Sequence, residues 1–165
     1  MSKKHAMPAF LEGTVTPQAY ERWLLGRAAA HVKRDRKRGH TCTGAAYRES
    51  IHQAVINSEG RDAYTGEELD WRLISTYRNE DSELGRHAYK AGFALLPSVD
   101  HVAAEATAAS FKICAWRTND AKNDMSVEAF VVLCKKVLEH AGYTVERRGS
   151  LKKNLPTRNQ VPGPD

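Results

Sequence analysis

Three polar residues in the second half of the chain have types and an order suited to phosphodiester hydrolysis. Asp100 and His101 are adjacent, and Asn119 follows them. Hydrolysis needs an activated water, a cation that stabilises charge on phosphorus and on the leaving oxygen, and orientation. A neutral imidazole accepts a proton from water near neutral pH, and carboxylate and amide oxygens suit a hard cation such as Mg²⁺. His101 is therefore a candidate general base, and Asp100 and Asn119 are candidate metal ligands.

The backbone must bring these groups together. Neighbouring side chains on a strand point to opposite faces, so Asp100 and His101 serve one site only if the strand turns, as it can at its end. We predict that Phe93, Leu95 and Val99 belong to a strand running into this pair. The alternation of residues 110–116 predicts a second strand. Asn119 then opens a helical segment, and Lys122 on that segment is a candidate for holding a phosphate.

Helices are predicted on both sides of this region. Thr16-Pro17 is a typical start for a helix over 17–36, and a second helix is expected over 44–57. Ser126 is an expected N-cap for an amphipathic helix over 127–140. Residues 64–66 form a predicted turn and residues 79–82 a predicted loop. Cys114 and Cys134 are expected in the core, and four histidines are expected to be ordinary helix or surface residues: His31, His40, His52 and His140.

The order of these residues resembles the His-Asn-His (HNH) endonuclease superfamily, over about residues 61–140. The resemblance implies an α+β fold with a ββα-metal core and additional N-terminal helices. It implies His101 as the general base, and Asp100 and Asn119 as ligands of one divalent cation, Mg²⁺ or alternatively Mn²⁺. Asn123 is a rival second ligand, but Asn119 keeps the family's spacing to Lys122.

Two departures from the family pattern stand out. The middle Asn of the motif, which holds the base in place, is replaced by Ser110. The positions that match the zinc-binding cysteines of many relatives hold none: Asp62, Thr65, Ala115 and Thr118. We therefore expect no structural zinc, and we expect packing by Tyr64, Phe111 and Trp116 to replace it.

Charge and composition indicate the class of partner. The 165 residues carry a net charge of +5 and are 41% hydrophobic, enough for one domain with tails. A dense basic block is a candidate phosphate contact: Lys33, Arg34, Arg36, Lys37 and Arg38. DNA is the expected partner, with RNA left open and no membrane contact, because no apolar run is long enough for a membrane span. The basic, apolar-poor N-terminus argues against a secretory signal, and three cysteines without a CxxC pair favour a reducing, cytoplasmic compartment.

These observations predict an irregular segment 1–15, a helical part 16–60, an HNH-like core 61–145 and a disordered basic tail 146–165. The first functional hypothesis is a metal-dependent DNA endonuclease. The alternatives are a catalytically decayed DNA-binding or interaction module on the same fold, and a small helical protein in which these motifs are coincidental. The residues leave sequence specificity, cut position, oligomeric state and pathway undetermined.

Overall fold

A computed structural model describes residues 4–76, 91–104 and 109–147. The predicted loop 79–82 and residues 148–165 of the predicted tail lie outside these ranges. The chain divides into two compact units, residues 1–130 and 131–165. The first unit holds every residue of the candidate site.

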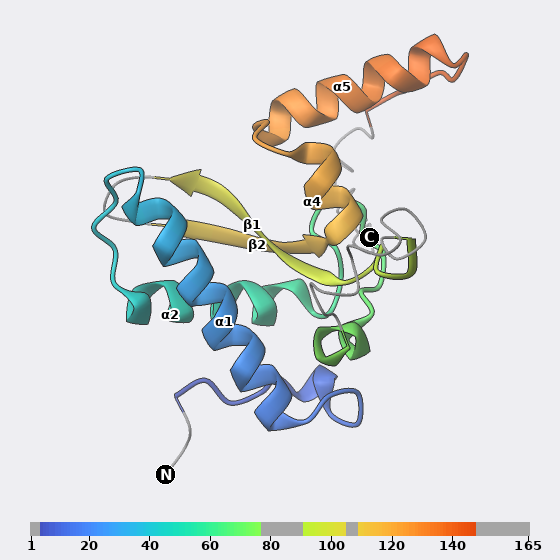
Figure 1. Cartoon of the computed structure of the whole chain (residues 1–165). Coiled ribbons are helices and arrows are strands. Elements are labelled where there is room, and N and C mark those ends of the chain that lie inside the picture. Colours follow the sequence, from blue (N-terminus) through green and yellow to red (C-terminus); the bar gives the residue numbers. More distant parts are fainter. Residues whose placement is uncertain (1–3, 77–90, 105–108, 148–165) are drawn as a thin grey trace, which may run out of the picture. The chain divides into compact units, whose positions relative to one another are not determined.

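Two helices form the N-terminal part of this unit (Figure 1). A short 3-10 helix, η1 (Ala9–Leu11), precedes α1 (Pro17–Arg36), and α2 (Gly44–Ser58) follows. The Thr16 hydroxyl accepts a hydrogen bond from the Ala19 N–H at 3.2 Å, and Thr43 caps α2 in the same way. Both predicted helices are therefore confirmed. After a second 3-10 helix, η2 (Trp71–Ser75), the chain leads to a hairpin.

The hairpin consists of β1 (Pro97–Ala104) and β2 (Ala109–Ala115), which pair antiparallel with His101 opposite Phe111. The first strand begins later than predicted, because residues 93–95 form a turn closed by the Leu96 N–H on the Phe93 carbonyl at 3.0 Å. The pairing is irregular between His101 and Ala103, which leaves Val102 as the extra residue of a β-bulge.

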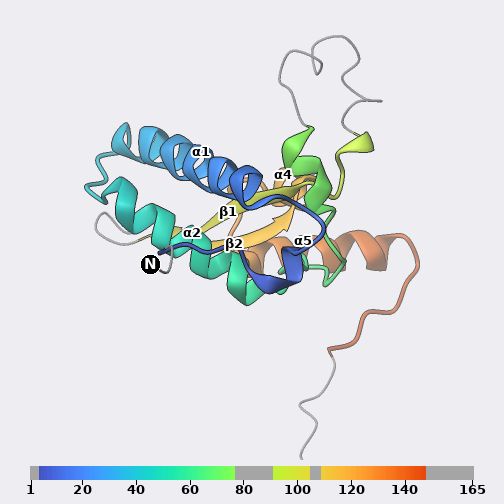
Figure 2. The same ribbon diagram turned by 90° about the horizontal axis from the view of Figure 1, so that it is seen from below.

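The two faces of the hairpin have different neighbours, as Figures 1 and 2 show from two sides. Val99, His101, Phe111 and Ile113 share one face; three of these are core residues packed with α1 and α2, and His101 lies beside them. Ser98 and Asp100 lie on the opposite face, where Asn119 and Lys122 of α4 contact them. Asp100 and His101 therefore point away from each other, as strand geometry requires.

The helix α4 (Trp116–Lys122) follows β2 without a loop. Asn119 lies inside this helix, so its predicted place at the helix start is wrong; the strand passes directly into the helix after Ala115. The next helix, α5 (Val127–His140), has the predicted bounds and the predicted Ser126 cap.

Cysteine burial was predicted correctly at one position and wrongly at another. Cys114 is fully buried, whereas Cys134 is exposed, because no residue of α5 is buried. The fold class is mixed α+β, with an antiparallel hairpin followed by a helix, as predicted at that level. Within the described ranges, none of the helices combines the length and apolarity that a bilayer crossing needs.

Candidate functional site

A polar cleft of about 780 Å³ runs along β1. Its lining comes from α1 and the turn after it, from β1, and from α4 with the turn that follows. Five of the residues predicted from the sequence line it: Asp100, His101, Asn119, Lys122 and Asn123. Two arginines of the basic block, Arg34 and Arg38, line it as well.

The edge position of β1 explains how residues from opposite faces reach one cleft. In the described part of the chain, β1 pairs only with β2, so its other edge carries no strand. Side chains from both faces of an edge strand can border a hollow along that edge. The predicted turn at a strand end is wrong, because Asp100 and His101 lie in the middle of β1.

On one side of β1, Asp100 forms what we call the Asp100 cluster with Lys122 and Tyr64. The Lys122 ammonium donates to Asp100 Oδ1 at 3.2 Å, and the Tyr64 hydroxyl donates to Oδ2. Asp100 is 5% exposed and Lys122 is 3% exposed. Lys122 is thus buried rather than solvated, and its charge is balanced by Asp100 within the cluster. Burial, and then the hydrogen bond to Asp100, raise the pKa of Tyr64.

Asn119 is held beside this cluster by a neighbouring strand residue. Its side-chain nitrogen donates to the Ser98 hydroxyl at 3.0 Å. This contact orients the amide and leaves its carbonyl oxygen as an acceptor. The rival ligand, Asn123, ends α4 with a positive φ of 49° and is exposed.

On the other side of β1, His101 forms what we call the His101 cluster with His31 and Asp35 of α1. His101 Nδ1 lies 3.4 Å from Asp35 Oδ2. The same Asp35 oxygen accepts a hydrogen bond from the Tyr47 hydroxyl of α2 at 2.8 Å. The His101 ring also stacks on Phe111, with ring centroids 4.9 Å apart. The ring of His101 is thus fixed by groups from α1, α2 and β2.

The electrostatics of the His101 cluster follow from burial and from one arginine. Burial, and then the Arg34 guanidinium, lower the pKa of His31 to about 4. Arg34 Nη2 contacts His31 Nδ1 at 2.7 Å. Burial alone would raise the pKa of Asp35, but the Tyr47 hydroxyl, His101 and Arg34 outweigh it and leave that pKa below its usual value. Near neutral pH the cluster therefore presents a neutral His31 and an ionised Asp35.

The His101 cluster can hold a metal ion. One ligand atom from each of His31, Asp35 and His101 lies within 4.8 Å of the others. The expectation that His31 is an ordinary helix or surface residue is wrong, since it is 7% exposed and packs on Phe111. The spacing of His31 and Asp35, one turn apart on a helix, is a sequence signal for a shared site. It becomes informative only once β1 brings His101 alongside.

Ser110, where the resemblance leads one to expect the middle Asn, is not placed to orient His101. Its side chain is exposed, and Ser110 pairs with Ala103 beyond the bulge. Asp35 is the polar group placed to orient His101 instead. Support for the candidate base thus comes from the N-terminal helices, a contribution that the motif did not indicate.

The basic block divides between separate surfaces. Arg34 and Arg38 line the cleft, whereas Lys33 and Arg36 border a different hollow beside Val32. Lys37 caps the end of α1 and is exposed. Helical geometry separates the residues because successive side chains point about 100° apart around the axis.

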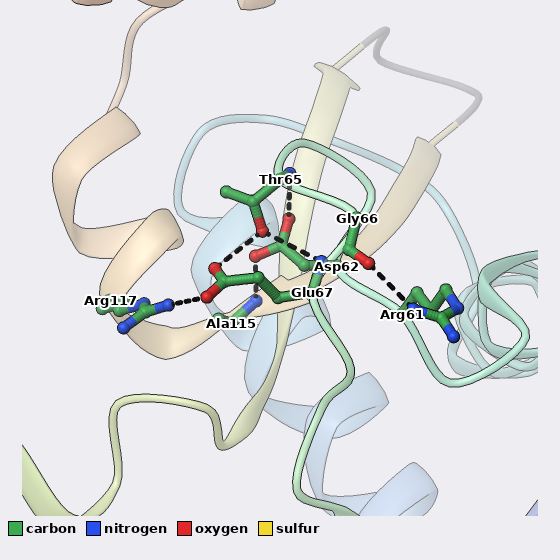
Figure 3. A network of polar contacts seen from close by, with 7 residues as sticks. All are labelled: Arg61, Asp62, Thr65, Gly66, Glu67, Ala115 and Arg117. Atoms are coloured by element: carbon green, nitrogen blue, oxygen red, sulfur yellow. Dashed lines mark hydrogen bonds and ion pairs between the residues drawn. The ribbon is translucent and has the colours of Figure 1, made fainter.

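Three of the four positions expected to match zinc-binding cysteines are linked here by hydrogen bonds: Asp62, Thr65 and Ala115 (Figure 3). Asp62 Oδ2 accepts from the Ala115 N–H at 2.8 Å, and Asp62 Oδ1 accepts from the Tyr64 and Thr65 N–H groups at 2.7 and 3.1 Å. A carboxylate that accepts hydrogen bonds from several backbone N–H groups holds their segments together strongly, because its negative charge strengthens each bond. Asp62 therefore connects the turn over 64–66 to the end of β2.

Around Asp62, exposed charges complete the network. Glu67 pairs with Arg117 of α4, and Arg61 donates to the Gly66 carbonyl at 3.2 Å (Figure 3). Phe111 does not lie beside Tyr64, although the packing expected of Tyr64, Phe111 and Trp116 requires it. Phe111 lies on the opposite face of the hairpin, against Tyr47. Polar contacts connect these segments instead.

Comparisons of this chain with protein-family models, with curated proteins and with solved structures found no match. The functional argument therefore depends on the geometry and chemistry of the cleft.

Proposed function

We propose that this protein is a metal-dependent endonuclease that hydrolyses phosphodiester bonds in DNA, with β1, β2 and α4 as a ββα-metal core of the HNH type. The observation that carries the proposal is the meeting of Asp100, His101 and Asn119 on one cleft with Arg34 and Arg38. An imidazole, two oxygen donors and two guanidinium groups are the functional groups that phosphodiester hydrolysis needs.

His101 takes the proton from the attacking water. Asp35, 3.4 Å from His101 Nδ1, orients the ring and stabilises the imidazolium that forms. The Tyr47 hydroxyl fixes Asp35 in turn. Asp35 and Tyr47 are positioning residues in this scheme, because they act on the reacting groups through His101.

Asp100 and Asn119 are the residues that would hold the cation, Mg²⁺ or in its place Mn²⁺. The donor set fits a hard cation, since a carboxylate and an amide carbonyl are oxygen ligands. When bound, the cation stabilises negative charge on phosphorus and on the leaving oxygen. Lys122 now neutralises Asp100 at 3.2 Å. Its ammonium group is also close enough to the cleft to bind a substrate phosphate once a cation takes over that neutralisation.

Arg34 and Arg38, from α1 and the turn after it, bind backbone phosphates of the substrate in the cleft. Guanidinium groups form paired hydrogen bonds with phosphate oxygens. Both arginine side chains are exposed, so they reach a substrate without rearrangement of the core. These contacts are to the backbone and would serve DNA and RNA alike.

The test is cleavage of supercoiled plasmid with and without Mg²⁺ or Mn²⁺, with single-stranded DNA and RNA as parallel substrates. The wild-type protein is expected to cut DNA only with metal, and His101→Ala to lower the rate by about 100-fold or more. His140→Ala, which removes an exposed histidine of α5, is the matched control and should cut normally. Equal cutting by wild type and His101→Ala would identify a contaminant and contradict the proposal.

A second candidate function is a non-catalytic nucleic-acid-binding module on the same fold. The observation that favours it is the buried ion pair of Asp100 and Lys122, in which the protein itself supplies the cation. DNA binding that weakens steeply with salt, without cleavage under any metal, would support this candidate.

A further inference from the structure

The His101 cluster joins two nitrogen donors and one oxygen donor from separate parts of the chain. His31 and Asp35 lie one turn apart on α1, and His101 comes from β1. Their potential ligand atoms lie within 4.8 Å of one another. His31 and Asp35 are 7% and 1% exposed, and the His101 side chain is 9% exposed. Three donors are therefore gathered in a largely dry environment.

The spacing of these donors is close to what a tetrahedral ion requires. With bonds of about 2.0–2.2 Å, two ligands of a tetrahedral Zn²⁺ lie roughly 3.3–3.6 Å apart. The distance of 3.4 Å between His101 Nδ1 and Asp35 Oδ2 falls in this range. The remaining separations, up to 4.8 Å, need about 1 Å of closure. Side-chain rotations of the three residues would have to supply that movement when an ion binds.

A fourth nitrogen donor lies next to the cluster. His40 Nδ1 is buried, and among the described residues it has no hydrogen-bond partner. The ring centroids of His40 and His101 are 6.4 Å apart. A buried imidazole nitrogen without a partner is costly, and an ion held by the cluster would offer His40 a ligand position after a side-chain rotation. This second observation is independent of the first three donors.

Arg34 now provides the positive charge that an ion would provide. Its Nη2 contacts His31 Nδ1 at 2.7 Å, and its Nε lies 3.5 Å from Asp35 Oδ1. The Arg34 side chain is 47% exposed, so it can turn into solvent. Asp35 would keep its hydrogen bond from Tyr47. The competitor of a bound ion is thus a single, partly exposed side chain.

We propose that His31, Asp35 and His101 form a binding site for a borderline transition-metal ion of the Zn²⁺ type. Imidazole nitrogens favour Zn²⁺ and its neighbours in the first transition row, whereas Mg²⁺ favours oxygen ligands. The site is therefore distinct in chemistry from the oxygen donors Asp100 and Asn119. A bound Zn²⁺ also engages His101, so it inhibits cleavage; this consequence alone rests on the proposed function.

The binding test uses the full-length protein stripped of metal with EDTA and titrated with Co²⁺, followed by Zn²⁺. We expect one equivalent of Co²⁺ with the strong visible absorption of tetrahedral coordination, displaced by Zn²⁺ and not by excess Mg²⁺. His31→Gln should weaken binding by at least about tenfold, in line with the effect of disturbing metal sites. His140→Gln, in an exposed part of α5, should leave binding unchanged.

Arg34→Ala keeps the test valid if His31→Gln fails to fold. Removing the competing guanidinium should strengthen Co²⁺ binding. Lys33→Ala removes the same charge from an exposed neighbour that borders a different hollow, and it should have a smaller effect. Absence of a one-to-one complex, affinity unaffected by His31→Gln, or a spectrum dominated by thiolate ligation from Cys134 would overturn the proposal.

Cleavage assays separate this inference from the proposed function. If the protein cuts DNA, one equivalent of Zn²⁺ should abolish Mg²⁺-dependent cutting, and Arg34→Ala should lower the Zn²⁺ concentration required. If the protein does not cut DNA, the Co²⁺ titration still decides the metal site. If the protein with Zn²⁺ bound still cut DNA at its full rate, that result would contradict Zn²⁺ binding at His101.

Discussion

The two sides of β1 each bury an aspartate, and they balance its negative charge in different ways. Each side buries an aspartate that accepts a tyrosine hydroxyl: Tyr64 on Asp100 and Tyr47 on Asp35. In the Asp100 cluster the balancing cation, Lys122, is 3% exposed. In the His101 cluster the cationic side chain beside Asp35 is Arg34, which is 47% exposed. The positive charge of Lys122 is therefore buried beside Asp100, whereas that of Arg34 beside Asp35 is accessible to solvent and can be exchanged for another cation.

This difference indicates which aspartate exchanges its positively charged partner more easily. A buried ion pair is hard to disturb, because removing one partner leaves an uncompensated charge in a low dielectric. An exposed arginine leaves its partner at little cost, because water solvates the freed guanidinium. A cation from solution should thus enter the His101 cluster more readily than the Asp100 cluster.

The largest expected effect on stability comes from removing the positively charged side chain beside each buried aspartate. Lys122→Met should lower the free energy of unfolding by about 3–5 kcal/mol, since Asp100 is left buried and charged. Arg34→Met should lower it by less than about 1 kcal/mol. Urea unfolding of both full-length variants measures the contrast. The double variant Asp100→Asn/Lys122→Met should recover part of the loss, and equal losses in the two single variants would refute the distinction.

The second-largest expected effect is a loss of stability at acid pH. His31 has a pKa of about 4 in the fold against 6.5 for the free side chain, so between these pH values the unfolded chain binds more protons. The free energy of unfolding should therefore fall as the pH drops from about 6.5 to 4, by up to about 3 kcal/mol from this residue. His52, whose pKa is lowered by burial and then by His5, adds in the same direction.

Urea unfolding across this pH range, in EDTA, checks the acid prediction. His31→Gln should flatten the profile, and His140→Gln, at an exposed position, should not. An unchanged slope in His31→Gln would show that the buried imidazole does not carry the linkage.

A matched pair of hydroxyl deletions sharpens the comparison further. Tyr47→Phe and Tyr64→Phe each remove a hydrogen bond to a buried carboxylate, worth about 1.5–3 kcal/mol of stability. Only Tyr47→Phe should alter Zn²⁺ affinity, because Asp35 and not Asp100 belongs to the His101 cluster. Denaturation and Co²⁺ titration of both variants are the measurements. Equal changes in Co²⁺ affinity in the two variants would mean that the clusters act as one unit.

The smallest effect concerns DNA binding by the basic block. Arg38 lines the cleft, whereas Lys33 borders a separate hollow. Arg38→Ala should reduce the slope of log affinity against log salt by about 1, and Lys33→Ala by less. Fluorescence anisotropy with a short duplex at several salt concentrations measures both slopes. A larger change for Lys33→Ala would move the expected DNA path away from the cleft.

Much of the local structure was predictable from the residues. Thr16-Pro17 and Ser126 mark helix starts through hydrogen bonds made within three residues of the cap, so the neighbouring sequence is sufficient. Alternation over 110–116 predicted β2 closely. The start of β1 was misplaced, because the turn over 93–95 is apolar and has the composition of a strand.

The sequence by itself determined which chemical groups this protein possesses: Asp100 beside His101, an Asn and a Lys one helical turn apart, and a basic block at the end of α1. Only the tertiary structure decided their partners. It paired Lys122 with Asp100, placed Asp35 against His101, and brought His31 close to both Asp35 and His101. The physical reason is that caps and periodicity depend on near neighbours in the chain. The partner of a buried charge depends instead on which distant segments exclude water around it.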